Sequence, residues 1–221
     1  LSLIDELPKN RIPITTKVIE PSRINKVYQF IRKEVSQKKQ CIIVYPLVEE
    51  SKSSDLAAAE EAYKELSSIQ FHNFEVGLLH GKMGSDDKKK IINQFENNDI
   101  SILVSTTVIE VGIDIKNATV MVVEHSERFG LTQLHQLRGR VGRGERKSYC
   151  ILVKRDLSDA SKERLSIMEN TNDGFVIADE DLKLRGPGEF FGSRQSGFFR
   201  YKIADMVKDG KLIRKARAEA F

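Results

Sequence analysis

The 221-residue chain has few of the residues that several protein classes require. Its two cysteines, Cys41 and Cys150, both stand beside apolar stretches, which favours buried free thiols in a reducing compartment over a disulfide framework. Cysteine and histidine do not cluster with metal-ligand spacing, so the sequence predicts no metal site. No apolar run approaches the length that spans a bilayer, and no signal peptide is visible. We therefore expect a cytoplasmic protein with no membrane partner.

Motifs that would let the chain hold a nucleoside triphosphate by itself are also missing. Residues 77–82, GLLHGK, have three residues between their glycines where a phosphate loop has four, and Met83 stands where Ser or Thr would hold magnesium. Residues 186–192, GPGEFFG, follow no strand and lack the spacing of a dinucleotide fingerprint. No acidic strand ends in a carboxylate for magnesium. We expect the chain alone to be inactive toward a triphosphate.

Length and charge leave the choice of partner open. With 221 residues and 40% hydrophobic content, the chain can bury one core and carry an appendage. A formal net charge of +4 permits a nucleic-acid partner without demonstrating one. The sequence begins abruptly with LSLIDELPKNR, so we expect it to be part of something longer.

Segments of strand length alternate with segments of helical periodicity. The expected strands are residues 15–19, 40–47, 74–79, 100–104, 119–123 and 149–153. Between them apolar residues recur at helical spacing. Ser85 is the expected N-cap of one helix, with Asp86 and Asp87 in the first turn. Because several strands are apolar throughout, the pattern predicts an α/β fold with a parallel sheet and helices on both faces.

Polar residues follow three of the expected strands. His80 and its neighbours follow the third strand, Ser105 to Thr107 follow the fourth, and the polar residues from Glu124 onward follow the fifth. Ligands of parallel sheets bind at the carboxyl ends of the strands. The topology therefore predicts that the candidate residues gather along one edge of the domain.

The stretch 133–144, QLHQLRGRVGRG, alternates arginines with glycines. Arginine grips phosphate with paired hydrogen bonds and stays charged where water is excluded. Gly139, Gly142 and Gly144 let the backbone approach another group closely. A helix C-terminus closed by Gly142 or Gly144, with basic residues favouring the helix dipole, explains the same residues. Taken alone, the stretch leaves a phosphate site and a helix cap equally open.

An upstream segment, residues 100–123, contains STTVIEVGID. Together, STTVIEVGID and QLRGRVGR resemble motifs V and VI of the superfamily 2 helicases and translocases. Motors of this superfamily have two RecA-like lobes with ATP in the cleft between them, and the first lobe carries the Walker A and B motifs. By that resemblance the chain is the second lobe, CIIVYPLVEE is motif IV, and LLHGKMGSDDK is the nucleic-acid-contacting motif that follows.

Residues 171–199 are too polar and glycine-rich for a core element, and composition alone equally allows a surface linker. However, DLKLRGPGEFFGSRQSG is very similar to the element that follows motif VI in the RecG family of bacterial ATP-dependent DNA helicases. Members of that family remodel branched DNA and stalled forks. Transcription-repair coupling factors share a related element, but the sequence motifs GPGEF, FG and RQSG favour the RecG family.

The resemblance implies a group of residues that face the nucleotide. Arg140 and Arg143 match the motif VI arginines that act as fingers on the γ-phosphate and counter the charge of the transition state. Gln136 stands near the γ-phosphate or the attacking water. Gly112 and Asp114 match the motif V residues that meet the nucleotide, with the carboxylate suited to a ribose hydroxyl. ATP and Mg²⁺ would be held mainly by the first lobe, which this chain lacks.

The resemblance also implies residues that face DNA or couple hydrolysis to movement. Contacts to the DNA backbone carry no sequence preference. The residues implied in such contacts are Thr106, Thr107, His80 and Gly81, with Thr107 the weaker candidate. The residues implied in a polar network that couples lobe movement to duplex translocation are Arg164, Arg185 and Gln195.

By the same resemblance, residues 1–20 form a connector and first strand, residues 21–157 the RecA-like lobe, and residues 158–221 a helical hairpin with a C-terminal amphipathic helix. The implied partners are branched double-stranded DNA, such as forks and Holliday junctions, and the first lobe and wedge domain of a monomeric, nucleoid-associated parent.

A different class stays open, namely a nucleic-acid-binding or interaction module of RecA-like fold without catalysis. A GxxxxGK[ST] loop upstream in the parent reading frame would decide for the motor. A metabolic nucleotide-binding enzyme is disfavoured, because no glycine-rich loop opens a helix after the first strand.

Overall fold

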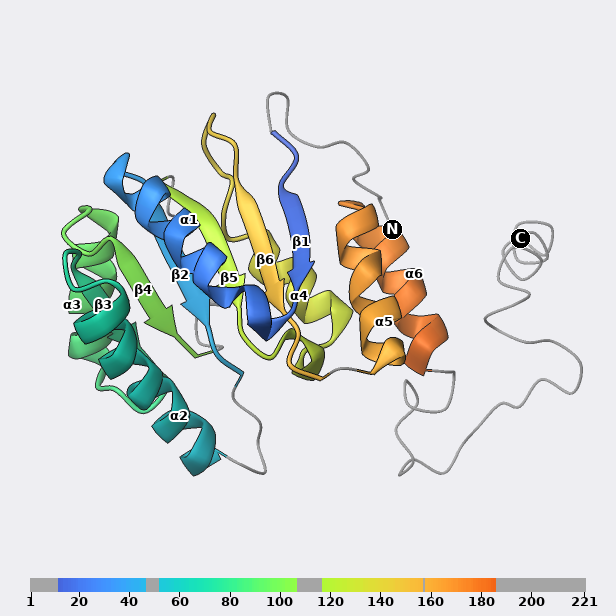
Figure 1. Cartoon of the computed structure of the whole chain (residues 1–221), viewed down its shortest axis with the longest axis horizontal. Coiled ribbons are helices and arrows are strands. Elements are labelled where there is room, and N and C mark those ends of the chain that lie inside the picture. Colours follow the sequence, from blue (N-terminus) through green and yellow to red (C-terminus); the bar gives the residue numbers. More distant parts are fainter. Residues whose placement is uncertain (1–11, 47–51, 107–116, 157, 186–221) are drawn as a thin grey trace, which may run out of the picture. The chain divides into compact units, whose positions relative to one another are not determined.

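The computed structural model describes residues 12–46, 52–106, 117–156 and 158–185. Within these residues, six strands form one sheet in which every neighbouring pair is parallel (Figure 1). The strands are β1 (Thr15–Ile19), β2 (Gln40–Val44), β3 (Val76–Leu79), β4 (Ile102–Ser105), β5 (Ala118–Val123) and β6 (Tyr149–Val153). Their order across the sheet is β1-β6-β5-β2-β4-β3. The predicted α/β fold with a parallel sheet is confirmed.

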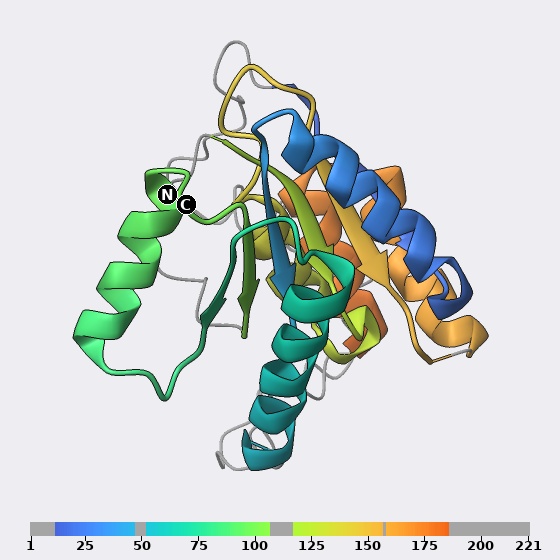
Figure 2. The same cartoon turned by 60° about the vertical axis from the view of Figure 1, so that its left-hand side comes forward.

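The described residues also form helices, several of which connect the strands and cover the sheet. They are α1 (Ile24–Ser36), α2 (Lys52–Glu65), α3 (Ser85–Glu96), α4 (Leu131–Arg138), α5 (Asp159–Asn170) and α6 (Gly174–Arg185). A π-helical turn, η3 (Leu66–Gln70), extends α2, and two short 3-10 turns, η1 (Pro21–Arg23) and η5 (Ser126–Arg128), precede α1 and α4. Because crossovers between parallel strands are right-handed, α1 and α2 lie on one face and α3 and α4 on the other. Figure 2 shows the sheet between α2 and α3.

The central strands are buried on both faces, which explains why their sequences are apolar throughout. Ile43 and Val122 belong to a cluster with Ile31 of α1. Ile42 and Met121 alternate with them and therefore point to the opposite face, where they are equally buried. A shift of one residue in register would exchange the two sets, so this pattern specifies the strand pairing.

Helix α4 begins after the β5–α4 connection, residues 124–130. Gly130 is extended (φ −67°, ψ 153°), and its N–H donates to Oε1 of Gln133 at 3.1 Å. The apolar side of α4 consists of three leucines without solvent exposure, Leu131, Leu134 and Leu137. This spacing fixes the short helix against the sheet.

The start of α3 differs from the sequence prediction. Gly84, not Ser85, is the N-cap, and no side chain caps the helix. Ser85 is instead the first helical residue, since the carbonyl oxygen of Gly84 already accepts the N–H of Lys88 at 3.0 Å. Asp86 and Asp87 do lie in the first turn, where their charge compensates the exposed N–H groups.

The chain divides into two compact units between Asn172 and Asp173. The first unit contains the sheet and α1 to α5, and α5 packs against β1. The second contains α6. The expected domain boundary after residue 157 stays a prediction, and the helix expected at the C-terminus lies outside the described residues. Across the described ranges, no helix is long and apolar enough to cross a membrane.

Candidate functional site

The ends of the neighbouring strands β3 and β4 bring two of the predicted site residues to one edge of the sheet. The N–H of Thr106 donates to the carbonyl oxygen of Leu79 at 3.2 Å, so Thr106 lies directly beside the end of β3, which His80 follows. The hydroxyl of the fully buried Thr106 has no hydrogen-bond partner, and neither has the buried Nδ1 of His80. Leaving such an atom unpaired costs about 1–3 kcal/mol. Two such atoms lie at these adjacent strand ends, and two others, Oε1 of Gln40 and Oγ1 of Thr119, lie on β2 and β5.

The turn after β3 is fastened to α3. The N–H of His80 donates to Sδ of Met83 at 3.4 Å, and Nζ of Lys88 donates to the carbonyl oxygen of Gly81 at 2.7 Å. The Nε2 atom of His80 lies 3.8 Å from Oε1 of Glu60 on α2. The exposed Gly81 therefore sits in a turn with a fixed backbone, next to the edge that carries Thr106.

Three further predicted residues, Thr107, Gly112 and Asp114, lie outside the described residues, and so does Gln195. Arg185 ends α6, but its side chain is not described. Among the described residues, no three His, Cys, Asp or Glu side chains gather in a way that could hold a metal ion.

One arginine of the 133–144 stretch belongs to the interior. Arg138 is 2% exposed, and its Nη1 donates to the carbonyl oxygens of Met168 at 3.0 Å and Thr171 at 2.9 Å. The same atom reaches Oγ1 of Thr16 at 3.3 Å, and Nη2 donates to Nδ1 of His135 at 3.0 Å. These bonds tie the end of α4 to β1 and α5. Arg138 thus serves the fold, although its sequence context resembles that of the other two arginines.

The other polar residues of the stretch remain on the surface. Gln136 is exposed on α4, Arg140 is half-buried and Arg143 is exposed. The Nε atom of Arg143 donates to the carbonyl oxygen of Gly139 at 3.4 Å. Gly139 is the C-cap of α4, so the helix ends earlier than either glycine expected to close it.

Gly142 shows why the stretch contains glycine. Its φ of +72° is strained for any L side chain, and an added Cβ would lie 3.0 Å from Cγ1 of Ile14 and 3.3 Å from Cβ of Ser148. At Gly142, the group that approaches the backbone closely is therefore another part of the protein itself. The N–H of Gly142 donates to the carbonyl oxygen of Ala118 at 3.3 Å.

This bond corrects the prediction that all candidate residues share one edge. Ala118 is the first residue of β5, so Gly142 lies at the amino end of that strand. Helix α4 carries the chain from the carboxyl edge, where Thr106 lies, back toward the opposite edge, where Arg143 follows Gly142. The prediction was wrong for the arginines because it counted strand ends and ignored the length of the helix between them.

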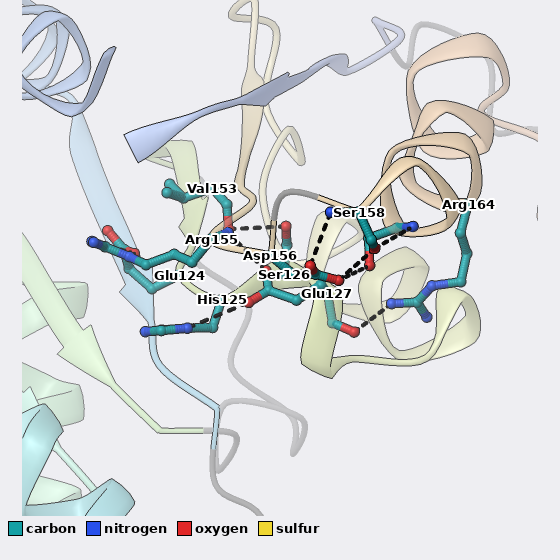
Figure 3. A network of polar contacts seen from close by, with 10 residues as sticks. Glu124, His125, Ser126, Glu127, Val153, Arg155, Asp156, Ser158 and Arg164 are labelled. Atoms are coloured by element: carbon teal, nitrogen blue, oxygen red, sulfur yellow. Dashed lines mark hydrogen bonds and ion pairs between the residues drawn. The ribbon is translucent and has the colours of Figure 1, made fainter. Parts of the chain in front are cut away.

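A polar network around the β5–α4 connection was missed by the sequence analysis (Figure 3). Glu124, which follows β5, is 1% exposed. The guanidinium of Arg155 donates to its Oε2 through Nε at 3.1 Å and Nη2 at 3.0 Å. The N–H of Arg155 donates to Oε2 of Glu127 at 3.0 Å, and Oγ of Ser126 donates to the carbonyl oxygen of Val153 at 3.0 Å. The connection is thus bound to the end of the neighbouring strand β6.

Arg164 of α5 holds the same connection from another side. Its guanidinium donates to the carbonyl oxygen of Phe129 at 2.7 Å. It also donates to the carbonyl oxygen of Glu127 (Figure 3). The structure therefore places the guanidinium of Arg164 against the segment that leads into α4. The predicted network with Arg185 and Gln195 stays a prediction.

The electrostatics of this region follow from burial. Burial raises the pKa of the Glu124 carboxyl above its ordinary value, and the nearby Arg155 guanidinium offsets only part of this rise. Burial, and then the charge of Glu124, raise the pKa of Tyr28 to about 12 and also raise that of Tyr45. The Arg155 guanidinium is hydrogen-bonded to the buried Glu124 carboxyl.

Two family models match the chain in order. The helicase conserved C-terminal domain matches residues 22–145, which is more than half of the chain. The model described as ATP-dependent DNA helicase RecG, domain 3, C-terminal, matches residues 171–221.

Known proteins with similar sequences are also described as RecG helicases. The chain is 50% identical over 220 residues to ATP-dependent DNA helicase RecG of Synechocystis and 48% identical over 220 residues to that of Bacillus subtilis. Both alignments cover 100% of this chain but only 26% and 32% of the relatives. The chain therefore spans between a quarter and a third of the length of these curated relatives.

Solved structures confirm the RecA-like helicase-lobe fold. A structure of RecG bound to a three-way DNA junction matches with a TM-score of 0.74 and 45% identity, over 95% of this chain and 27% of that chain. Domain 2 of the DEAD-box helicase Mss116p bound to an RNA duplex matches with a TM-score of 0.56 and 17% identity, over 72% of this chain and 61% of that chain, and so shares the fold alone. The chain thus belongs to the helicase conserved C-terminal domain family, in its RecG branch.

Proposed function

We propose that this chain is the C-terminal motor lobe of an ATP-dependent double-strand DNA translocase that remodels branched DNA and stalled replication forks in recombination and repair. The observation that carries the proposal is that the arginine stretch is held in place on both sides of Arg140. Arg138 is locked into the interior by its bonds to Met168 and Thr171, and Gly142 is locked against Ile14. Arg140 lies between these two fixed points.

Arginines that are held in place suit the chemistry of phosphoryl transfer. The protein stabilises the charge that grows on the phosphoryl oxygens chiefly through cations that are already in place. In this proposal Arg140 and Arg143 are those cations, and Gln136 lies near the γ-phosphate or the attacking water. Gly112 and Asp114 meet the nucleotide. ATP and Mg²⁺ are bound mainly by a first lobe, whose Walker A and B motifs this sequence lacks.

The carboxyl edge is assigned to DNA. The unpaired hydroxyl of Thr106 and the unpaired Nδ1 of His80 would find partners on the DNA backbone, together with Thr107 and Gly81. Such contacts go to phosphates and sugars and read no sequence. DNA and nucleotide are therefore assigned to opposite edges of the sheet, with α4 running between them.

Coupling between the two edges is assigned to Arg164, Arg185 and Gln195. The proposed partners are forks and Holliday junctions, and the first lobe and wedge domain of a parent that acts as a monomer. In this proposal the protein works on nucleoid DNA in the bacterial cytoplasm.

The direct test is nucleotide hydrolysis by the purified chain. Without the Walker residues, it should show no DNA-stimulated ATPase and only weak nucleotide binding. Robust turnover, with contaminating ATPases removed, would contradict the division of labour between lobes.

The alternative is a nucleic-acid-binding module without catalysis. The two unpaired polar atoms at the carboxyl edge suit such a module as well as they suit a motor. It has no use for the arginines at the opposite edge, so their substitution separates the two functions.

A further inference from the structure

We propose that Arg155 is a positioning residue for the arginine stretch, acting through the two glutamates of the β5–α4 connection. This inference rests on the proposed function, because it concerns the residues assigned to phosphoryl transfer. Neither the motifs of the sequence nor the matched family descriptions single out Arg155.

Arg155 holds the β5–α4 connection at two points. Its guanidinium donates twice to Oε2 of Glu124, at 3.1 and 3.0 Å, and its backbone N–H donates to Oε2 of Glu127 at 3.0 Å. Between these points, Oγ of Ser126 donates to the carbonyl oxygen of Val153 at 3.0 Å. Figure 3 shows these contacts converging on the short turn that leads into α4.

The burial of the two partners is unequal. The side chain of Glu124 is 1% exposed, whereas that of Arg155 is 40% exposed. A buried carboxylate that loses its cation keeps its desolvation penalty without compensation. Removing the guanidinium should therefore disturb the connection where Glu124 lies and leave the surface position itself undisturbed.

The connection contains a sharp bend that depends on these anchors. His125 has left-handed backbone dihedrals, φ 48° and ψ 46°, which are unfavourable for residues other than glycine. Its neighbours Glu124 and Ser126 are both bonded to the end of β6. The bend persists because the chain is held on both sides of it, and it sets the direction in which the chain enters α4.

The direction of α4 matters because the helix acts as a lever. Its eight residues span about 12 Å, so a tilt of about 5° at its start moves its end by about 1 Å. A misplacement of about 1 Å can cost about a hundredfold in rate. The bonds of Arg138 to Met168 and Thr171 restrain the far end of α4, so losing Arg155 should displace that end by less than this and should not release the helix.

The experiment uses the full-length protein with both lobes and measures DNA-stimulated ATP hydrolysis. Arg155→Ala should lower kcat about tenfold, while KM for ATP and the Kd for fork DNA change less than about twofold. Arg155→Lys should recover only part of the loss, since an ammonium cannot make the paired contact of a guanidinium. Arg23→Ala is the matched control. Arg23 is exposed after β1 at the same edge, and no side-chain bond joins it to another described residue.

A double-mutant cycle with Arg143→Ala separates positioning from a loss of folded protein. A smaller folded fraction would lower turnover by the same factor in both backgrounds. If Arg155 acts through the arginine stretch, its substitution should lower turnover by a smaller factor once Arg143 is gone, since Arg140 is then the only one of the two assigned cations left to position. An equal factor in both backgrounds would overturn the role of Arg155 alone. Unchanged turnover in Arg143→Ala by itself would overturn the proposed function, and this inference with it.

Discussion

Arg138 of α4 and Arg164 of α5 bind the two helices to each other in opposite directions. Arg138 donates to the carbonyl oxygens at the end of α5, and Arg164 donates to the carbonyl oxygens ahead of α4. Arg138 thus holds the C-terminal end of α5, and Arg164 holds the segment that leads into α4. The arrangement fixes α4 without any contact to a ligand.

Arg138→Ala should therefore act on stability. It removes the buried guanidinium that donates to the carbonyl oxygens of Met168 and Thr171, so the free energy of unfolding should fall by about 2–4 kcal/mol. Urea unfolding of the purified chain measures this. Arg146→Ala, at an exposed position, is the control and should change stability by less than about 0.5 kcal/mol. Equal effects of the two substitutions would show that the buried bonds contribute nothing.

Thr106→Val should separate stability from DNA binding. Valine removes a buried hydroxyl that has no partner, so the free energy of unfolding should stay the same or rise. In the full-length protein, fork affinity should fall about 3- to 10-fold through the loss of one hydrogen bond, and Thr106→Ser should retain it. A destabilised variant with normal affinity would mean that the hydroxyl serves the fold.

Asp156 should make part of the stability depend on pH. Hydrogen bonds from the hydroxyls of Ser158 and Ser161 and from the N–H of Ser158 lower its pKa from 3.8 to about 2. Because the folded-state pKa is the lower one, this stabilisation is complete above pH 3.8 and disappears as the pH falls toward 2. Asp156→Asn should lower the melting temperature at neutral pH, and the difference should shrink across that interval. A difference that is constant with pH would exclude the ionised carboxylate as its cause.

The sheet was predictable because its strands are buried on both faces. Residues 15–19 and 149–153 matched β1 and β6 at both ends, since turn-forming or charged residues flank them. The second strand was expected to run to residue 47 but ends at Val44, because apolar residues continue past the last ladder bond. An apolar pattern indicates that a strand is buried, whereas the residue at which the strand ends depends on its pairing with neighbouring strands.

The site was less predictable, for two physical reasons. Arg138 and Arg140 stand two residues apart in one motif, and only the orientation of α4 decides that the first points inward. The pair of Glu124 and Arg155 joins residues 31 positions apart. Strand pairing brings them together, and no local pattern indicates it. A polar run directly after a buried strand was the one available signal.

The central claim is that the arginine stretch acts on the γ-phosphate, and turnover of the Arg143→Ala variant tests it most directly. In the full-length protein, DNA-stimulated ATP hydrolysis should fall about a thousandfold or more, as it does when other arginine fingers are removed. The Kd for fork DNA, measured on the same preparation, should stay within about twofold of the unsubstituted protein, since Arg143 is assigned to the edge opposite the DNA contacts. ATPase activity that stays intact while fork binding weakens would contradict the account and make Arg143 a clamp on the DNA backbone.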